Sequence, residues 1–89
     1  MDVSVIIVNY NTKQMTLDCI NSVFEQTKDI SFEVFLVDNN STDGSLELFN
    51  KDTRIHFIES GENLGFGRAN NLAYPQTKGK YIFFLKSAG

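Results

Sequence analysis

Three polar segments each follow a run of apolar residues, and their side chains are of kinds that bind small molecules. The first segment is Asn9-Tyr10-Asn11, the second runs from Asp38 to Ser45, and the third runs from Ser60 to Arg68. In an open α/β sheet, ligands bind in the crevice outside the carboxyl ends of the strands. If the three apolar runs are neighbouring parallel strands, the sequence predicts one binding site at that edge of the sheet.

Asp38 has two interpretations. Alone at the end of a buried strand, it fits a helix or turn cap and a ligand contact equally well. Together with Ser41 and Asp43 it favours ligand binding, because a carboxylate accepts a hydrogen bond from the N–H of a base. Ser41 and Asp43 are also expected to structure the loop through local backbone bonds, which is the main role of Ser41. Gly44 is expected to supply an unusual backbone angle or a close helix start.

Asn9, Tyr10 and Asn11 stand where the first strand opens into a loop. Tyr10 offers a ligand its flat ring or its backbone. Asn11 precedes Gln14 by three residues, the spacing of a capping box, so a helix cap is a strong alternative for Asn11. Capping a helix and lining a pocket are compatible roles.

The segment after the third apolar run contains two glycines and enters a helix. The backbone amides at Gly65 and Gly67 would attract an anion such as phosphate, and Arg68 adds a positive charge that can pair with a diphosphate. The glycine spacing alone favours an ordinary turn with a solvated Arg68. His56, in the middle of the third apolar run, is expected to be an exposed strand residue rather than a catalytic base.

Apolar runs and helical patterns alternate along the chain. The runs are continuous and rich in β-branched residues, which is typical of strands that are buried on both faces of a parallel sheet. The alternation predicts an α/β fold with three layers, in which helices cover both faces of a four-stranded parallel, Rossmann-like sheet. The expected strands are residues 3–8, 33–37, 54–59 and 81–85, and the expected helices are residues 12–26, a short one ending at 49, and 65–74.

Length and composition limit the class of protein. Eighty-nine residues form one domain, and a net charge of -3 argues against a nucleic-acid partner, which would require a basic surface. Cys19 is the single cysteine and is expected to be a small apolar residue on a helix. No apolar run approaches the ~20 residues of a membrane span, and no signal peptide is visible, so a cytoplasmic chain is expected.

Three segments of the chain resemble the family 2 glycosyltransferases, most closely the rhamnosyltransferase-like group. They are Val5 to Asn11, Val37 to Ser45 and Asn63 to Asn71, and they occur in the family's order. The resemblance spans nearly all 89 residues as a single partial domain, the N-terminal, nucleotide-binding half of a GT-A fold. It implies a nucleotide-sugar donor of the UDP or dTDP type and transfer to a saccharide hydroxyl with inversion, in surface polysaccharide synthesis.

The resemblance also assigns roles by position. The base of the nucleotide would be bound by Asp38. The pocket for the base and the ribose would be lined by Asn9, Tyr10 and Asn11. The ribose and the diphosphate would lie near Gly65, Gly67 and Arg68.

The chain departs from the family after the fourth strand. There the family has an Asp-x-Asp or Asn-x-Asp sequence that holds a divalent metal, Mg²⁺ or Mn²⁺. Lys86 and Ala88 occupy these positions, and neither offers the oxygen ligands that a hard cation needs. The family's general base lies further along its sequence. We therefore expect no metal site and no catalytic residue in this chain, and no sugar transfer by the chain alone.

The strand from Tyr81 to Leu85 is very apolar. In the family's sheet this strand is internal, but here it would lie at an edge. A long apolar edge tends to pair with another chain, which predicts a homodimer or a larger assembly through this strand. An alternative to the glycosyltransferase function is therefore a non-catalytic, self-associating α/β interaction module that binds no nucleotide.

Overall fold

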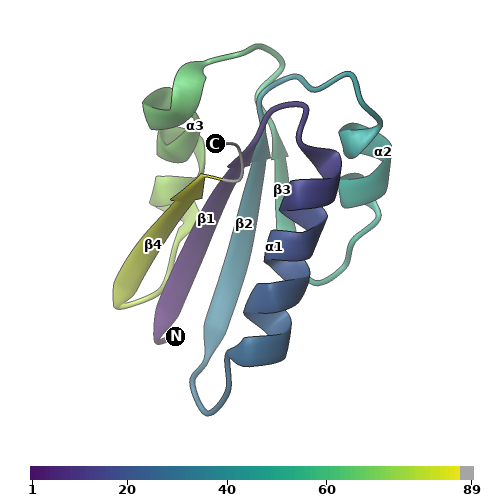
Figure 1. Ribbon diagram of the computed structural model, residues 1–89. Helices are drawn as coiled ribbons and strands as arrows, with labels where there is room; N and C mark the ends of the chain where they lie inside the picture. The colour runs from purple at the N-terminus through teal and green to yellow at the C-terminus, as the bar shows by residue number, and fades with distance from the viewer. Residues whose placement is uncertain (87–89) are drawn as a thin grey trace.

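A computed structural model describes residues 1–86 of the chain (Figure 1). Within these residues four parallel strands form one sheet in the order β3-β2-β1-β4, so the predicted α/β fold is confirmed. The elements are β1 (Val3–Asn9), α1 (Lys13–Gln26), β2 (Phe32–Asp38), α2 (Ser45–Asn50), β3 (His56–Glu59), α3 (Gly65–Ala73), the 3-10 helix η1 (Tyr74–Gln76) and β4 (Tyr81–Lys86).

Helices cover both faces of the sheet, as Figure 1 shows. Successive side chains of a strand point to opposite faces, so a continuous apolar run supplies both cores. In β1, Val5 and Ile7 pack on the side of α1 and α2, whereas Ile6 and Val8 pack on the side of α3. In β2, Val34 and Leu36 join the first core, and Phe35 and Val37 join the second, together with Ala69 and Ala73 of α3.

The predicted capping box at the start of α1 is wrong. Asn11 takes a left-handed backbone conformation with φ of 53°, which turns its side chain toward the loop after β2. There its Oδ1 accepts a hydrogen bond from the backbone N–H of Thr42 at 2.7 Å. The Gln14 side chain donates within its own helix instead. The first turn of α1 is held from outside, because Asp43 Oδ2 accepts a bond from the Lys13 N–H at 3.0 Å.

The third strand is shorter than predicted. It begins at His56 rather than at Arg54, because Arg54 belongs to a turn in which its backbone and guanidinium both bond Asp52. The side chain of His56 is 61% exposed, as expected for a strand residue that faces solvent. Its ring stacks on Phe35 with 4.6 Å between the centroids.

Cys19 lies half-buried on α1 against the core, as expected of a small apolar residue, and burial raises the pKa of its thiol. The α1 helix has 14 residues, whereas a helix needs ~20 apolar residues to cross a bilayer. Among the described residues, no helix combines the length and apolar character of a membrane span.

The buried carboxylate of Glu33 joins the strands at their amino ends. Its Oε2 accepts hydrogen bonds from Ser4 Oγ at 2.6 Å and from the Lys78 N–H at 2.7 Å. Ser4 Oγ in turn accepts a bond from the Gly79 N–H at 2.8 Å. A Cβ at Gly79 would lie 2.5 Å from the Ser4 nitrogen, so only glycine allows this approach. Glu33 Oε1 also lies 3.9 Å from His56 Nε2. The network ties β1, β2 and the turn before β4 together.

This network predicts a pH-dependent contribution to stability. Burial alone would raise the pKa of Glu33, but the bonds from Ser4 and Lys78 outweigh burial, and the pKa lies below its usual value. The contribution is therefore complete above the usual value of about 4.3 and is lost as the pH falls through the depressed folded-state pKa. Glu33→Gln should lower the free energy of unfolding by about 1–3 kcal/mol at pH 7 and by less near pH 3.

Urea denaturation of both proteins at the two pH values measures this difference. The control is Glu25→Gln, because Glu25 is an exposed carboxylate at the end of α1. A stability gap of equal size at both pH values would show that the charge of Glu33 contributes nothing.

Candidate functional site

Two buried polar side chains join the carboxyl ends of β1 and β2. Asn9 and Asp38 are partners in the strand register, and both are 0% exposed. Asn9 Nδ2 donates to Asp38 Oδ1 at 2.7 Å and lies 3.2 Å from Ser41 Oγ, which it also contacts as a donor. The Ser41 N–H donates to Asp38 Oδ2 at 2.7 Å. Both oxygens of Asp38 therefore have partners within the protein, and the residue is fully buried.

The other end of the Asn9 amide fixes the start of α1. Asn9 Oδ1 accepts hydrogen bonds from the Thr12 N–H at 3.3 Å, from Thr12 Oγ1 at 2.9 Å and from Thr16 Oγ1 at 2.8 Å. A buried amide is stable only when its polar atoms are bonded, and here both ends of the amide are. The structure thus places Asn9 beneath the site rather than on its surface.

The loop between β2 and α2 is held by side-chain contacts with the loop after β1. Ser41 Oγ accepts from the Asn11 N–H at 2.9 Å, and Asp43 also bonds the N–H and the hydroxyl of Ser45. Burial tends to raise the pKa of Asp43, but the bonds from Ser45 and Lys13 outweigh it and hold that pKa below its usual value. Gly44 has φ of 90°, a left-handed conformation that glycine adopts without strain. These contacts set the shape of the loop.

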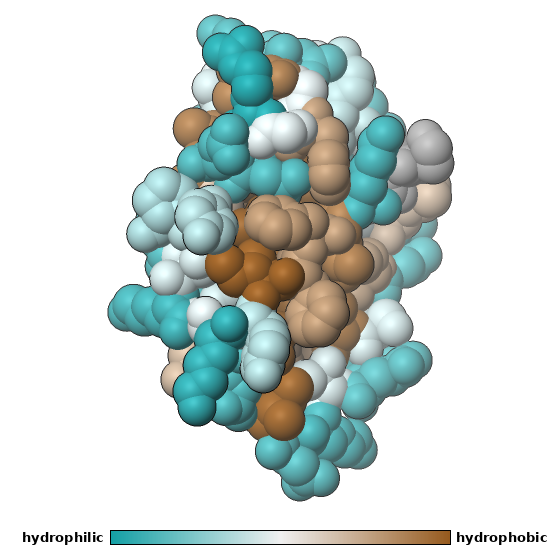
Figure 2. All heavy atoms as spheres, turned by 90° about the vertical axis from the view of Figure 1, so that its left-hand side faces the viewer, coloured by the Kyte–Doolittle hydropathy of each residue, from teal (hydrophilic) through white to brown (hydrophobic). Residues whose placement is uncertain are grey.

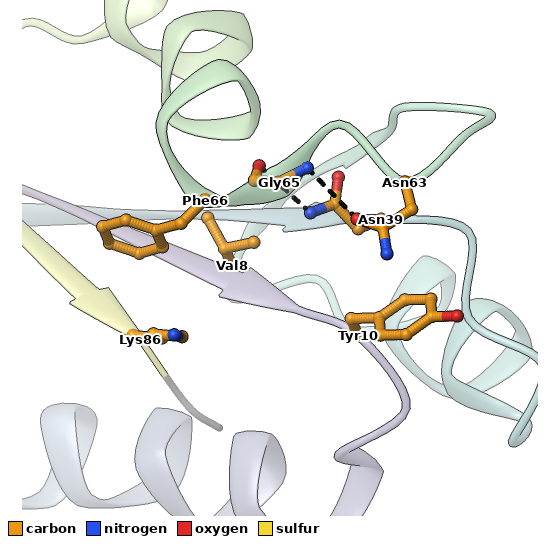
Figure 3. A pocket seen from close by; sticks show the side chains of 7 residues that line it. All are labelled: Val8, Tyr10, Asn39, Asn63, Gly65, Phe66 and Lys86. Atoms are coloured by element: carbon orange, nitrogen blue, oxygen red, sulfur yellow. Dashed lines mark hydrogen bonds between the residues drawn. The ribbon is translucent and has the colours of Figure 1, made fainter. Parts of the chain in front are cut away.

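A cavity of about 300 Å³ opens beside this network. It lies where β1 and β4 end and α3 begins, and Figure 3 shows the side chains around it. Its volume is at the lower end of the range for small-molecule sites. The lining residues are Val8, Tyr10, Asn39, Asn63, Gly65, Phe66 and Lys86.

The sequence interpretation did not assign five of the lining residues to the site: Val8, Asn63, Phe66, Lys86 and Asn39. Asn39 joins β2 to α3, because its Nδ2 donates to the Gly65 carbonyl at 3.3 Å (Figure 3). Its Oδ1 accepts from the Leu64 N–H at 3.4 Å. Side chains alternate along a strand. Asp38 turns toward the α1 side, so Asn39, the next residue, turns toward the α3 side, where the cavity lies. Alternation thus signals that Asp38 and Asn39 turn to opposite faces, and packing decides which of the two faces the cavity.

The structure separates the predicted site residues into groups. Tyr10, which is 45% exposed, and Gly65 line the cavity. Asn11 is exposed but bonded to the neighbouring loop. Gly67 and Arg68 are exposed on the first turn of α3, outside the set of residues that line the cavity.

The residues around the cavity do not fit a divalent metal. Among residues 1–86, no three or more His, Cys, Asp or Glu side chains gather as metal ligands. The charged side chain in the cavity lining is Lys86, whose ammonium repels a cation. Ala88, the other position at which the family's metal ligands are expected, lies outside the described residues.

Comparisons with known proteins identify the family. The family model described as Glycosyl transferase family 2 matches residues 4–87. The relative named UDP-Glc:alpha-D-GlcNAc-diphosphoundecaprenol beta-1,3-glucosyltransferase WfaP, from Escherichia coli, is 37% identical over 96% of this chain and 34% of its own length. The chain spans about a third or less of the curated relatives that it matches.

Solved structures agree with the sequence relatives. TarS residues 1–349 from S. aureus, in complex with UDP, matches 98% of this chain and 27% of its own with a TM-score of 0.84 and 31% identity. The mannosyltransferase PcManGT from Pyrobaculum calidifontis, in complex with GDP-Man and Mn²⁺, matches 96% of this chain and 27% of its own with a TM-score of 0.83 and 26% identity. The fold, the motifs and the relatives together show that the chain belongs to glycosyltransferase family 2.

Proposed function

We propose that the chain is the donor-binding portion of a cytoplasmic glycosyltransferase, which transfers a sugar from a UDP- or dTDP-sugar to a saccharide acceptor in surface polysaccharide synthesis. The observation that carries this proposal is the cavity at the carboxyl ends of β1 and β4, with two aromatic rings and two amides among the side chains that line it. The TarS complex with UDP and the UDP-Glc in the name of WfaP support a uridine nucleotide.

The side chains of the cavity match the chemistry of a nucleoside. The Tyr10 ring offers a face on which a base can stack, and the amides of Asn39 and Asn63 can donate to and accept from its polar edge. Asn39 takes the direct contact that the sequence interpretation gave to Asp38, because Asn39 lines the cavity and Asp38 does not. Asn39 is only 3% exposed, but its amide keeps one N–H and one lone pair beyond its bonds to Gly65 and Leu64. In this proposal Asn9 and Asp38 position the residues that follow them. Asn11 holds the loop, and Gly65, Gly67 and Arg68 remain expected contacts of the ribose and the diphosphate.

The chain alone is proposed to bind a donor without transferring its sugar. The described residues around the cavity do not fit the divalent metal that the family uses with the diphosphate. The matched part is also only 34% of WfaP and 27% of the TarS chain, so most of each relative lies outside the match. Incubation of the chain with UDP-glucose should therefore release no UDP. Ligand-observed NMR of the mixture measures any UDP that forms.

A titration with nucleotides tests the binding site. UDP should bind in preference to GDP and ATP in ligand-observed NMR. Asn39→Ala should lower the affinity for UDP about tenfold through lost hydrogen bonding, and Tyr10→Ala should lower it about tenfold through lost stacking. Asn50→Ala is the matched control, because Asn50 is an exposed amide at the end of α2. No binding of any nucleotide to the folded chain, or equal binding by all variants, would refute the site.

The roles of Asp38 as a structural residue and as a base contact make different predictions. Asp38→Asn should lower the free energy of unfolding by about 1–3 kcal/mol, since the Asn9 amide and the Ser41 N–H share a buried acceptor that loses its charge. The exposed Asp18 on α1 supplies the control Asp18→Asn. Urea denaturation and UDP titration are run on the same samples. Loss of UDP binding with unchanged stability would instead establish direct contact with the base.

The surface over β4 favours the second candidate function, self-association. Tyr81 is 69% exposed, Phe83 55% and Phe84 47%, and β4 is an edge of the described sheet. Figure 2 shows apolar side chains gathered in the middle of this side of the molecule. We propose a second copy of the chain as the occupant, because an unpaired edge presents the same backbone groups to its own copy about a two-fold axis. In the longer relatives, chain outside the match is a competing occupant.

Sedimentation velocity tests this association. The chain should sediment as a dimer or larger species at tens of micromolar, and Phe84→Lys should yield a monomer, because a charge on an edge strand opposes pairing. Leu48→Lys places the same charge on α2, on the opposite face of the sheet, and should leave association unchanged. A monodisperse monomer of the parent chain would exclude the second candidate.

A further inference from the structure

Lys86 is the charged side chain in the lining of the cavity. It is the last residue of β4 and pairs in register with Val8 of β1, so it lies at the same edge of the sheet as Tyr10. The ion pairs within residues 1–86 join Arg54 to Asp52 and bring His56 near Glu33. No carboxylate in that part of the chain lies within ion-pair distance of the Lys86 ammonium, which is therefore available to an anionic ligand.

The cavity has different chemistry at its two ends. Figure 3 shows Tyr10, Asn39 and Asn63 toward one end, and Lys86 and Phe66 toward the other. Stacking and amide contacts at the first end fit a base, whereas an ammonium at the second end fits an anion. A nucleoside diphosphate has the same polarity, with a neutral base at one end and two phosphates at the other.

We propose that the Lys86 ammonium binds the diphosphate of the nucleotide. Its positive charge beside the phosphates allows the nucleotide to bind without a divalent cation. This inference rests on the proposed function, since it needs a nucleotide in the cavity. A lysine ammonium binds phosphate as a point charge with three donors. It also opposes entry of a metal ion, because like charges repel and the described lining contains no carboxylate to offset the repulsion.

The assignment differs from the one that the sequence favoured. Arg68 was the predicted cation for the diphosphate and remains an expected contact, but it lies outside the residues that line the cavity, whereas Lys86, which is also exposed, belongs to them. Lys86 lines the cavity because the strand order places β4 directly beside β1. The substitution Lys86→Arg therefore compares an ammonium with a guanidinium at the same position of the cavity.

Titrations of uridine, UMP and UDP, each in EDTA and in Mg²⁺, test the inference on the full chain. Affinity should rise from uridine to UDP in EDTA, and Mg²⁺ should change the UDP affinity by less than about twofold. Lys86→Met should lower the affinity for UDP about tenfold and change the affinity for uridine by less than about twofold, because the substitution removes a charge-assisted contact with phosphate alone. Lys86→Arg, which keeps the charge, should restore most of the UDP affinity.

Lys80→Met is the matched control, because Lys80 is an exposed lysine that precedes β4, at the opposite end of that strand. UDP binding that requires Mg²⁺, or that is equal in Lys86→Met and Lys80→Met, would overturn the inference while uridine binding keeps the proposed function intact. Failure of uridine and UDP alike to bind the folded parent chain would overturn both. Thermal melts of each variant confirm that a lost affinity is not lost folding.

Discussion

The hydrogen bond between Asn9 and Asp38 is the contact on which the site depends. Both side chains are fully buried, and a buried amide or carboxylate without a partner costs about 1–3 kcal/mol, so each fixes its neighbours. Asn9 fixes the first turn of α1, and Asp38 fixes the loop at Ser41. The residues that follow the pair in sequence, Tyr10 and Asn39, then emerge into the cavity. The wall of the cavity is thus set by a contact beneath it.

A second buried pair secures the opposite ends of the same two strands. Ser4 and Glu33 are register partners, as Asn9 and Asp38 are, and lie five positions earlier on each strand. Because five is odd, the two pairs lie on opposite faces of the sheet. Ser4 and Glu33 fasten the turn that leads from α3 to β4, whereas Asn9 fastens α1. A slip of one residue between β1 and β2 would break both pairs, so together they specify the register.

The sequence predicted the strands, their order along the chain and the edge of the sheet at which the cavity lies, because long β-branched runs and polar strand ends are strong local signals. It did not predict which of Asp38 and Asn39 faces the cavity. A strand buried on both faces has no amphipathic pattern, so its direction of alternation is set only by packing. The conformation of Asn11 was equally hidden, since asparagine suits both a helix cap and a left-handed turn. Sheet order, which brings Lys86 to the cavity, is a tertiary property.

The two walls of the cavity differ in how firmly they are held. The wall at Tyr10 and Asn39 rests on the central strands and their buried pairs. The wall at Lys86 rests on β4, which has one neighbouring strand among the described residues and exposed aromatic side chains. Regions with fewer buried contacts open more readily. A chain that pairs with β4, as proposed, would therefore also hold Lys86 in place, and a nucleotide bound by Lys86 would favour the paired strand in return. If both proposals hold, edge pairing and diphosphate binding are linked reciprocally through β4.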